Sequence, residues 1–169
     1  DQVAKLLNRH FALLAGCIEA EDGTVDKFIG DSVMAFWGAP DHYADHADRA
    51  VRAAQAIERA LDEDNKTRVA AGEPEIKIRI GLHSGPVTVG NIGAPGRINY
   101  TIIGDNVNLA QRLEQLGKQF TSDPSLKRSV TTLLTAATAD QLTSKHALDD
   151  LGDQTVRGRN GKIRVYRLS

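Results

Sequence analysis

Two short segments carry side chains whose types and spacing could do chemistry. In the first, 23–31 (Gly-Thr-Val-Asp-Lys-Phe-Ile-Gly-Asp), Lys27 lies on the first strand of a predicted hairpin and Asp31 lies at its tip. A lysine ammonium donates hydrogen bonds, and an aspartate carboxylate is a hard oxygen ligand for a cation such as Mg²⁺. The segment therefore predicts either a site for a polar ligand and a metal ion, or a surface hairpin with a solvated lysine and a turn-favouring Gly-Asp pair.

The second segment is 99–112, Asn-Tyr-Thr-Ile-Ile-Gly-Asp-Asn-Val-Asn-Leu-Ala-Gln-Arg. Asn108 and Arg112 are four residues apart in a helical pattern, so their side chains project from one face. An amide and a guanidinium near the start of a helix suit an anionic ligand. The alternative is an ordinary polar stripe, and the spacing alone does not separate the two.

Other common nucleotide and metal motifs are missing from the sequence. It contains neither a P-loop nor a Gly-x-Gly-x-x-Gly that opens a helix. The five histidines are scattered, and His42 and His46 have no cysteine or third histidine near them, which argues against zinc. The one cysteine, Cys17, lies in an apolar helical stripe and is interpreted as a small core residue.

The elements that must position these segments follow from hydrophobic periodicity. Apolar residues recur every three or four positions over the first twenty residues, and again from Ala47 to Leu61, which predicts two helices. Residues 24–29 and 32–37 are predicted to form a hairpin around Gly30-Asp31. Strict alternation over 76–82 predicts a strand.

The later elements are shorter and are separated by glycine and proline. We expect strands at 87–89 and 98–103 with a glycine-rich loop at 90–96 between them, then a helix over 107–116 that stops at Gly117 in a left-handed cap. A polar mobile loop at 119–129, a strand at 130–134, a short helix at 136–142 and strands at 147–151 and 163–168 complete the pattern. This order predicts an α/β sandwich with helices against a mostly antiparallel sheet.

Composition indicates one ordinary globular domain over residues 1–169. The hydrophobic fraction is 41%, the charged fraction is 25% and the net charge is −1, with both signs spread along the chain. This balance gives no electrostatic case for nucleic acid or a membrane surface. With no membrane-spanning run and no signal peptide, we expect a cytoplasmic domain.

The two segments, taken with others in the same order, resemble the class III nucleotidyl cyclase catalytic domain. The matching blocks are Lys-Phe-Ile-Gly-Asp at 27–31, Ile-Gly-Leu-His-Ser-Gly-Pro-Val at 80–87 and Tyr-Thr-Ile-Ile-Gly-Asp-Asn-Val-Asn-x-Ala-x-Arg-Leu at 100–113. The closing segments at 150–159 and 165–168 are also similar to that family. The resemblance implies a ferredoxin-like palm that works as a head-to-tail homodimer and converts ATP to cyclic AMP and pyrophosphate with two Mg²⁺ or Mn²⁺ ions.

The resemblance also implies roles for individual residues. Asp31 matches a metal-binding aspartate, Lys27 a residue that contacts adenine, and Thr101 its partner position. A lysine donor and a threonine acceptor suit adenine, whereas guanylyl cyclases of this family tend to carry Glu and Cys there. Threonine is typical of the subclass that includes bicarbonate-responsive cyclases, so bicarbonate regulation stays open.

The remaining matches concern the ribose and the phosphates. Asn108 matches the residue that orients the ribose, and Arg112 the residue that stabilises charge on the α-phosphate. Arg157 falls where relatives have a triphosphate-binding lysine, and Arg97 is a weaker candidate for the same contact. The glycine-rich loop matches the segment that reaches toward the partner. Asp31 would act in the site completed by the other chain.

One departure from the family pattern affects the expected activity. The family's opening strand, with the first metal-binding aspartate, is not found in these residues, so we expect residues 1–169 alone to have little or no cyclase activity. The main alternative is a catalytically silent regulatory module that binds nucleotide or a partner domain without turnover. In the full-length protein we expect an upstream sensor or regulatory domain. A diguanylate cyclase is disfavoured because 29–32, Ile-Gly-Asp-Ser, lacks that family's Gly-Gly-Asp/Glu-Glu-Phe turn.

Overall fold

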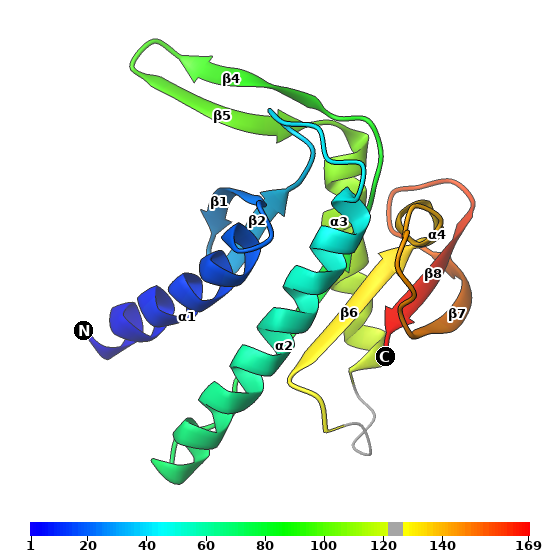
Figure 1. Ribbon diagram of the computed structural model, residues 1–169. Coiled ribbons are helices and arrows are strands. Elements are labelled where there is room, and N and C mark those ends of the chain that lie inside the picture. The colour runs from blue at the N-terminus through cyan, green and yellow to red at the C-terminus, as the bar shows by residue number, and fades with distance from the viewer. Residues whose placement is uncertain (122–126) are drawn as a thin grey trace. The chain divides into compact units, whose positions relative to one another are not determined.

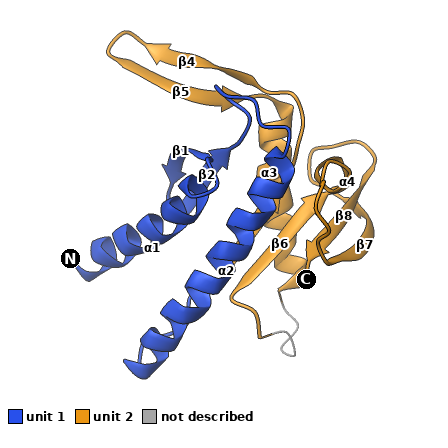
Figure 2. Cartoon of the chain, in the orientation of Figure 1, with its two compact units in different colours: residues 1–76 blue, residues 77–169 orange. Residues whose placement is uncertain are grey.

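The computed structural model describes residues 1–121 and 127–169. The chain divides into two compact units, residues 1–76 and residues 77–169 (Figure 2). Each unit has its own helices and its own β-structure (Figure 1). No helix within the described residues is both long enough and apolar enough to cross a bilayer.

Unit 1 consists of two helices and the predicted hairpin between them. Its elements are α1 (Gln2–Glu19), β1 (Thr24–Ile29), β2 (Ser32–Phe36) and α2 (His46–Ala70). The strands pair antiparallel around the tight turn at Gly30 and Asp31. Both helices and the hairpin lie where the apolar periodicity predicts them.

Helices α1 and α2 pack together through the apolar stripes read from the sequence. Leu14 and Ile18 of α1 are buried, as are Val51, Ile57 and Leu61 of α2. Removing such a side chain from a close-packed core costs about 2–5 kcal/mol for leucine or isoleucine to alanine. These contacts stabilise the layer from which the hairpin projects.

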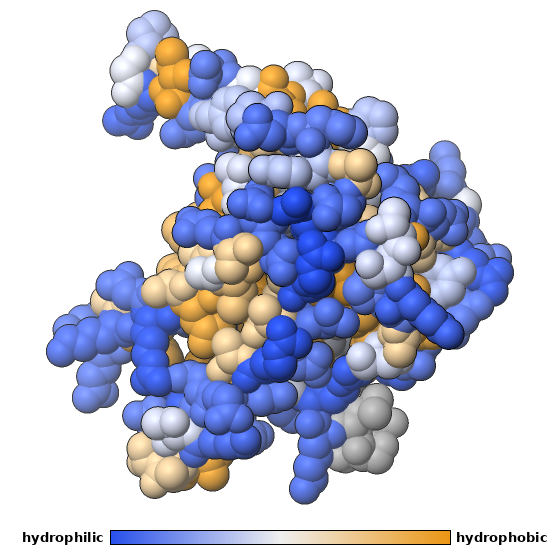
Figure 3. Space-filling view, viewed as in Figure 1, coloured by the Kyte–Doolittle hydropathy of each residue, from blue (hydrophilic) through white to orange (hydrophobic). Residues whose placement is uncertain are grey.

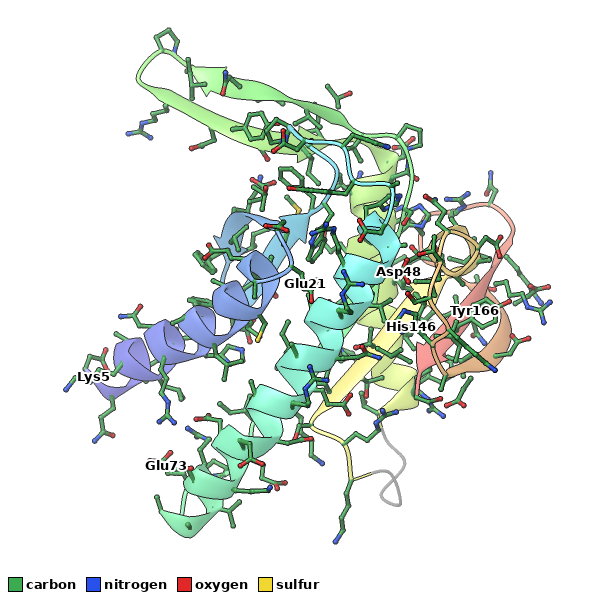
Figure 4. All side chains as sticks on the ribbon, viewed as in Figure 1. Lys5, Glu21, Asp48, Glu73, His146 and Tyr166 are labelled. Carbon is green, nitrogen blue, oxygen red and sulfur yellow. The ribbon has the colours of Figure 1, made fainter. Side chains whose placement is uncertain are left out.

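Polar contacts secure both ends of α2. Near its start, Arg52 donates to the carboxylate of Glu21, which follows α1, at 3.0 Å. Figure 4 labels Glu21. Near its end, the buried Asn65 amide of α2 exchanges two hydrogen bonds of 2.8 Å with the backbone of Ile76, which follows the helix. Arg68 pairs with Glu73 at 3.0 Å. The long helix is therefore held by directional contacts as well as by its apolar stripe.

Unit 2 combines a four-stranded mixed sheet, a separate hairpin and the helix α3. The sheet order is β3-β6-β8-β7, in which β3 and β6 are parallel and the other two pairings are antiparallel. The hairpin is β4 with β5. The bounds are β3 (Ile78–Leu82), β4 (Thr88–Ala94), β5 (Arg97–Ile103), α3 (Asp105–Leu116), a 3₁₀ turn η1 (Gly117–Phe120), β6 (Val130–Thr135), α4 (Ala136–Ala139), β7 (Leu148–Thr155) and β8 (Lys162–Leu168).

The core of unit 2 lies between α3 and the sheet. Leu109, Leu113 and Leu116 of α3 pack with Leu133 of β6 and Val165 of β8, and all five side chains are buried. Because these leucines occupy one face of α3, the helix presents Asn108 and Arg112 from another part of its surface. The predicted arrangement, helices against a mostly antiparallel sheet, is confirmed.

Two local predictions are wrong. Most of the expected glycine-rich loop 90–96 is strand, because the hydrogen bonds between β4 and β5 join backbone N–H and C=O groups, which glycine has like any other residue. Gly93 pairs with Ile98, and only Pro95-Gly96 forms the turn. Gly117 is no left-handed cap: its φ is −54° and the chain continues into η1. Its small size instead lets the side chain of Arg79 lie close to it.

Other boundaries shift by a few residues. The short helix expected over 136–142 ends at Ala139, and β7 extends to Thr155 instead of stopping at 151. The predicted polar loop 119–129 begins inside η1, and its central residues 122–126 lie outside the described residues.

Candidate active site

The β1–β2 hairpin presents two of the predicted site residues. Lys27 is exposed on β1 opposite Met34, next to a β-bulge where the register shifts between Val25 and Lys27. A bulge re-aims the side chains beside it. Asp31 is exposed at the turn. Neither Lys27 nor Asp31 has an ion pair or side-chain hydrogen bond within the described parts of the chain, so both are available to a ligand.

The hairpin rests on α1, which brings His10 close to Asp31. The rings of Phe28 and Phe11 lie 4.4 Å apart. Burial lowers the pKa of His10, while the negative charges of Asp31 and Asp64 act in the opposite direction. Asp31 is therefore within electrostatic reach of a ring that stays mainly neutral at neutral pH.

In unit 2, β5 leads directly into the helix that carries the second segment. Thr101 is 6% exposed and pairs with Gly90 across the β4–β5 ladder. Two residues after β5, α3 begins at Asp105. Asn108 is exposed on its first turn, and Arg112 is half-buried one turn later. The carboxylate of Asp105 lies in the first turn, where it complements the positive end of the helix dipole.

The loop between β7 and β8 packs its backbone against the guanidinium of Arg112. A methyl group at Gly158 would lie 3.1 Å from Cζ of Arg112 and 3.2 and 3.3 Å from its terminal nitrogens. Gly158 has a φ of +77°, a conformation that favours glycine. The loop therefore restricts where the Arg112 guanidinium can lie.

Two further arginines flank Gly158. Arg157 and Arg159 are both exposed, and the backbone N–H of Arg159 donates to the carbonyl of Val156 to close a tight turn. Neither they nor Arg112 has an ion pair or side-chain hydrogen bond among residues 1–121 and 127–169, whereas Arg164 on β8 is paired with Asp150. The turn thus gathers guanidinium groups without a carboxylate to neutralise them, which suits a polyanionic ligand.

Comparison with known proteins shows the family to which the chain belongs. The sequence model described as the adenylate and guanylate cyclase catalytic domain matches residues 1–169. The chain belongs to this family.

The cyclase domain is similar to both adenylyl and guanylyl cyclases. It is 34% identical to adenylate cyclase 1 of Rhizobium meliloti over 168 residues, which are 99% of the chain and 24% of that relative. The solved structure of the adenylyl cyclase CyaB from P. aeruginosa has a TM-score of 0.87 at 30% identity, over 99% of this chain and 82% of that one. The guanylyl cyclase Cya2 has a TM-score of 0.85 at 27% identity, over 98% and 79%.

These likenesses establish the catalytic-domain fold, the ferredoxin-like palm of class III cyclases. The cyclase domain spans about a fifth to a third of the curated relatives' lengths, with 24% of the Rhizobium meliloti protein, 20% of a Mycobacterium bovis relative and 32% of the Anabaena cylindrica adenylate cyclase. Since adenylyl and guanylyl cyclases are both among its neighbours, the nucleotide it uses is a separate question.

Within unit 2, most of the predicted site residues lie on or next to α3, whereas Arg97 lies away from them. Asn108, Arg112 and the Arg157 turn lie around α3, and Thr101 precedes that helix on β5. Arg97 instead lies beside the Pro95-Gly96 turn. It is four residues from Thr101 on one strand, about 13 Å away along β5. On this chain Arg97 is thus remote from the Arg112 cluster.

Sequence reasoning missed three residues around this site. Arg159 was overlooked because a charged residue in a polar turn carries no pattern, although its place beside Arg157 in Val-Arg-Gly-Arg was a usable signal. His83 and Asn106 hydrogen-bond to each other at 2.8 Å from distant parts of the sequence. No spacing rule could have found that contact.

Proposed function

We propose that the domain is an adenylyl cyclase that converts ATP to 3′,5′-cyclic AMP and pyrophosphate. The observation that carries the proposal is the half-buried Arg112, which lies under the Gly158 backbone with no carboxylate partner among the described residues. Asn108 lies one turn earlier, and Arg157 and Arg159 flank the same loop. Uncompensated guanidinium groups beside a helix are suited to a triphosphate.

The proposed reaction is an attack of the ribose 3′-hydroxyl on the α-phosphorus. The hydroxyl gives up its proton to solvent water as its oxygen bonds to the α-phosphorus. The bond between the α-phosphorus and the oxygen that bridges to the β-phosphate breaks, and pyrophosphate leaves with the bonding electrons. Asn108 holds the ribose, and Arg112 stabilises the charge that develops on the α-phosphate oxygens. Because such reactions depend mainly on positioning and charge stabilisation, loss of Arg112 should slow turnover by about a thousandfold or more.

Adenine is the base that the residue types favour. Lys27 donates to an acceptor nitrogen on the edge of adenine, and the Thr101 hydroxyl can accept from the exocyclic amine. Guanine presents a donor N–H where adenine has the acceptor nitrogen, so the Lys27 ammonium would face another donor, whereas the Thr101 hydroxyl could donate to the guanine carbonyl.

Asp31 fits the role of one ligand in a divalent metal site. It is an exposed carboxylate with no ion pair or side-chain hydrogen bond among residues 1–121 and 127–169, and Mg²⁺ commonly takes one or two carboxylates together with substrate phosphates. No group of three or more His, Cys, Asp or Glu side chains in the described part of the chain could hold a metal alone. When bound, two Mg²⁺ or Mn²⁺ ions would activate the hydroxyl and hold the triphosphate.

We further propose that the active site is shared between two copies in a head-to-tail homodimer. The β4–β5 hairpin exposes large apolar side chains, among them Ile92, Ile98, Tyr100 and Ile103, and Figure 3 shows hydrophobic atoms at its tip. Exposed apolar side chains on a two-stranded arm suit burial against a partner. In this arrangement Asp31 acts in the site that contains Arg112 of the partner copy.

Product analysis tests the reaction. The full-length protein that carries this chain is incubated with ATP or GTP and Mg²⁺ or Mn²⁺, and the cyclic nucleotides are separated by chromatography. We expect cyclic AMP from the wild type, and loss of it in Asp31→Ala and Arg112→Ala. A protein that binds ATP without turnover would support a silent regulatory module, and unchanged rates in both variants would refute the site.

Mixing the two inactive variants tests the shared site. A dimer of one Asp31→Ala chain and one Arg112→Ala chain contains one site with both native residues and one site with neither. Random exchange makes half of the dimers mixed, so activity should return to about a quarter of the wild-type level. No recovery after verified subunit exchange would mean that both residues act within the same chain.

A further inference from the structure

A chain of polar contacts joins three elements of unit 2 at one end of its sheet. His83, just after β3, lies with Nδ1 2.7 Å from Oγ1 of Thr135, the last residue of β6. Its Nε2 lies 2.8 Å from Oδ1 of Asn106, the second residue of α3. Asn106 in turn donates from Nδ2 to the carbonyl of Pro86 at 2.7 Å. Figure 1 shows the end of β6 and the start of α3 at the same end of this unit.

The positions of the hydrogens in this network follow from the carbonyl of Pro86. A carbonyl can only accept, so the amide nitrogen of Asn106 faces Pro86 and its oxygen faces His83. That oxygen also only accepts, so Nε2 of His83 carries the proton. In the neutral ring Nδ1 then accepts from the Thr135 hydroxyl. The neutral Nε2–H tautomer satisfies every group in the network.

Burial keeps the ring in this state. Desolvation lowers the pKa of His83, the hydrogen bond to Asn106 raises it, and the positive charge of Arg159 lowers it further. The net direction is downward. At neutral pH the ring is therefore uncharged and can hold the tautomer that Asn106 requires.

The amide of Asn106 has little room to move away. A methyl group at Gly85 would lie 2.5 Å from its Nδ2 and 2.6 Å from its Cγ, so the backbone at 85 packs directly on the amide. The adjacent Ser84 hydroxyl also hydrogen-bonds the hydroxyl of Thr138 in α4 at 2.9 Å. The segment 83–86 is thus tied both to the β6–α4 connection and to α3.

The hydrogen bond between His83 and Asn106 acts on the end of α3 that carries the proposed site. Asn108 is two residues beyond Asn106, about 3 Å along the helix axis, and Arg112 follows one turn later. The apolar face of α3, with Leu109 and Leu113, resists tilting of the helix away from the sheet, but apolar contacts are non-directional and allow small slides and rotations. A hydrogen bond with fixed donor and acceptor geometry restricts those movements.

We propose that His83 is a positioning residue for the cyclase reaction, which through Asn106 fixes the first turns of α3 and thereby the places of Asn108 and Arg112. This inference rests on the proposed function of that helix. His83 itself need not touch the nucleotide. Its effect is on the orientation of groups that act mainly in the transition state.

Kinetics of three variants of the full-length protein test the proposal. His83→Phe keeps a ring but removes the hydrogen bonds to Asn106 and Thr135. Asn106→Ala removes the hydrogen bond to His83 from the α3 side and leaves the His83 ring in place. We expect each to lower kcat by about tenfold to a hundredfold with little change in KM for ATP, as expected for misplacement approaching 1 Å. The double variant should be no slower than the worse single variant, because both break one link.

Ser84→Ala is the matched control. It removes a neighbouring hydrogen bond of similar length, to Thr138, without touching α3. Thermal unfolding is measured for all variants, and Ser84→Ala should retain kcat within about twofold even if its stability falls. Wild-type kcat in both His83→Phe and Asn106→Ala, or an equal loss in Ser84→Ala, would overturn the positioning role.

Two readouts do not depend on cyclase activity. Nitrogen-15 NMR should show His83 as the neutral Nε2–H tautomer, and the Nδ1–H tautomer would contradict the network. The backbone N–H of Asn108 donates to the carbonyl of Gly104 at 3.3 Å, and its hydrogen exchange should be faster in His83→Phe than in the wild type. An unchanged exchange rate would refute the claim that His83 holds the start of α3 in place. If the wild type makes no cyclic nucleotide, the proposed function fails, and these readouts still decide whether His83 anchors α3.

Discussion

Replacing Gly158 by alanine should reduce turnover through the position of Arg112. The new methyl group would lie 3.1 Å from Cζ of Arg112, closer than ordinary van der Waals contact, so the guanidinium must move by a few tenths of an ångström. If a misplacement of 1 Å costs about a hundredfold in rate, a shift of this size should lower kcat by roughly three- to tenfold. The side chain is flexible at this end, so the site should be distorted and not destroyed.

Gly161 in the same loop provides the matched control. Its φ is +86°, close to the +77° of Gly158, but a methyl group there would meet nothing within 4 Å. Both substitutions should cost about 1–2 kcal/mol of stability, because alanine is strained in the left-handed region. Only Gly158→Ala places an atom against Arg112.

The assay compares initial rates of cyclic AMP formation at saturating ATP with thermal unfolding of the same samples. The expected result is a similar fall in Tm for both variants, about 2–8 °C, and a loss of kcat confined to Gly158→Ala. Equal losses of kcat in the two variants would assign the effect to loop strain. A wild-type kcat in Gly158→Ala would show that the loop does not position Arg112, and would refute the reasoning.

Three further predictions concern charge, base selection and pH. Arg159→Ala should raise KM for ATP about three- to tenfold with kcat nearly unchanged, because a triphosphate contact is lost equally in the ground and transition states. The control is Arg164→Ala, which removes an arginine already paired with Asp150 and should leave KM unchanged. Equal effects of the two substitutions in steady-state kinetics would argue against a phosphate contact of Arg159. Lys27→Glu combined with Thr101→Cys should lower kcat/KM for ATP by about tenfold to a hundredfold and raise that for GTP, and an unaltered ratio of the two would refute their role in base selection. Burial lowers the pKa of His83 below its ordinary 6.5, so the His83 ring takes up a proton at a higher pH in the unfolded chain than in the folded one. The stability contributed by the neutral ring is therefore complete above pH 6.5 and is lost as the pH falls below 6.5. Chemical denaturation at several pH values should therefore show a shallower decline in His83→Phe than in the wild type, and identical slopes would contradict the lowered pKa.

Local periodicity was sufficient to predict most of the elements. The apolar repeats of α1 and α2 and the Gly30-Asp31 turn signal each involve residues close in sequence, so the prediction needed no knowledge of distant contacts. The wrong predictions concern positions where a partner strand or a side chain from elsewhere in the chain decides the backbone conformation. Gly93 is in a strand because β5 pairs with it, and Gly117 stays right-handed with Arg79 close beside it.

The sequence by itself determined the candidate chemistry. Asn108 and Arg112 share a helical face because of their spacing, and Lys27, Asp31 and Thr101 were recognised through the order of the motifs that contain them. These residues have the hydrogen-bonding and metal-binding groups that the proposed reaction needs. Their chemical types follow from the sequence whatever the fold.

Only the tertiary structure decided what surrounds and orients those residues. The β7–β8 turn lies against Arg112, and His83 bonds Asn106 and Thr135, 23 and 52 residues away along the chain. Both contacts depend on the sheet order β3-β6-β8-β7 and on the packing of α3 across it. A sequence pattern records neighbours along the chain, whereas these neighbours are set by strand pairing and burial, which act between segments that share no local signal.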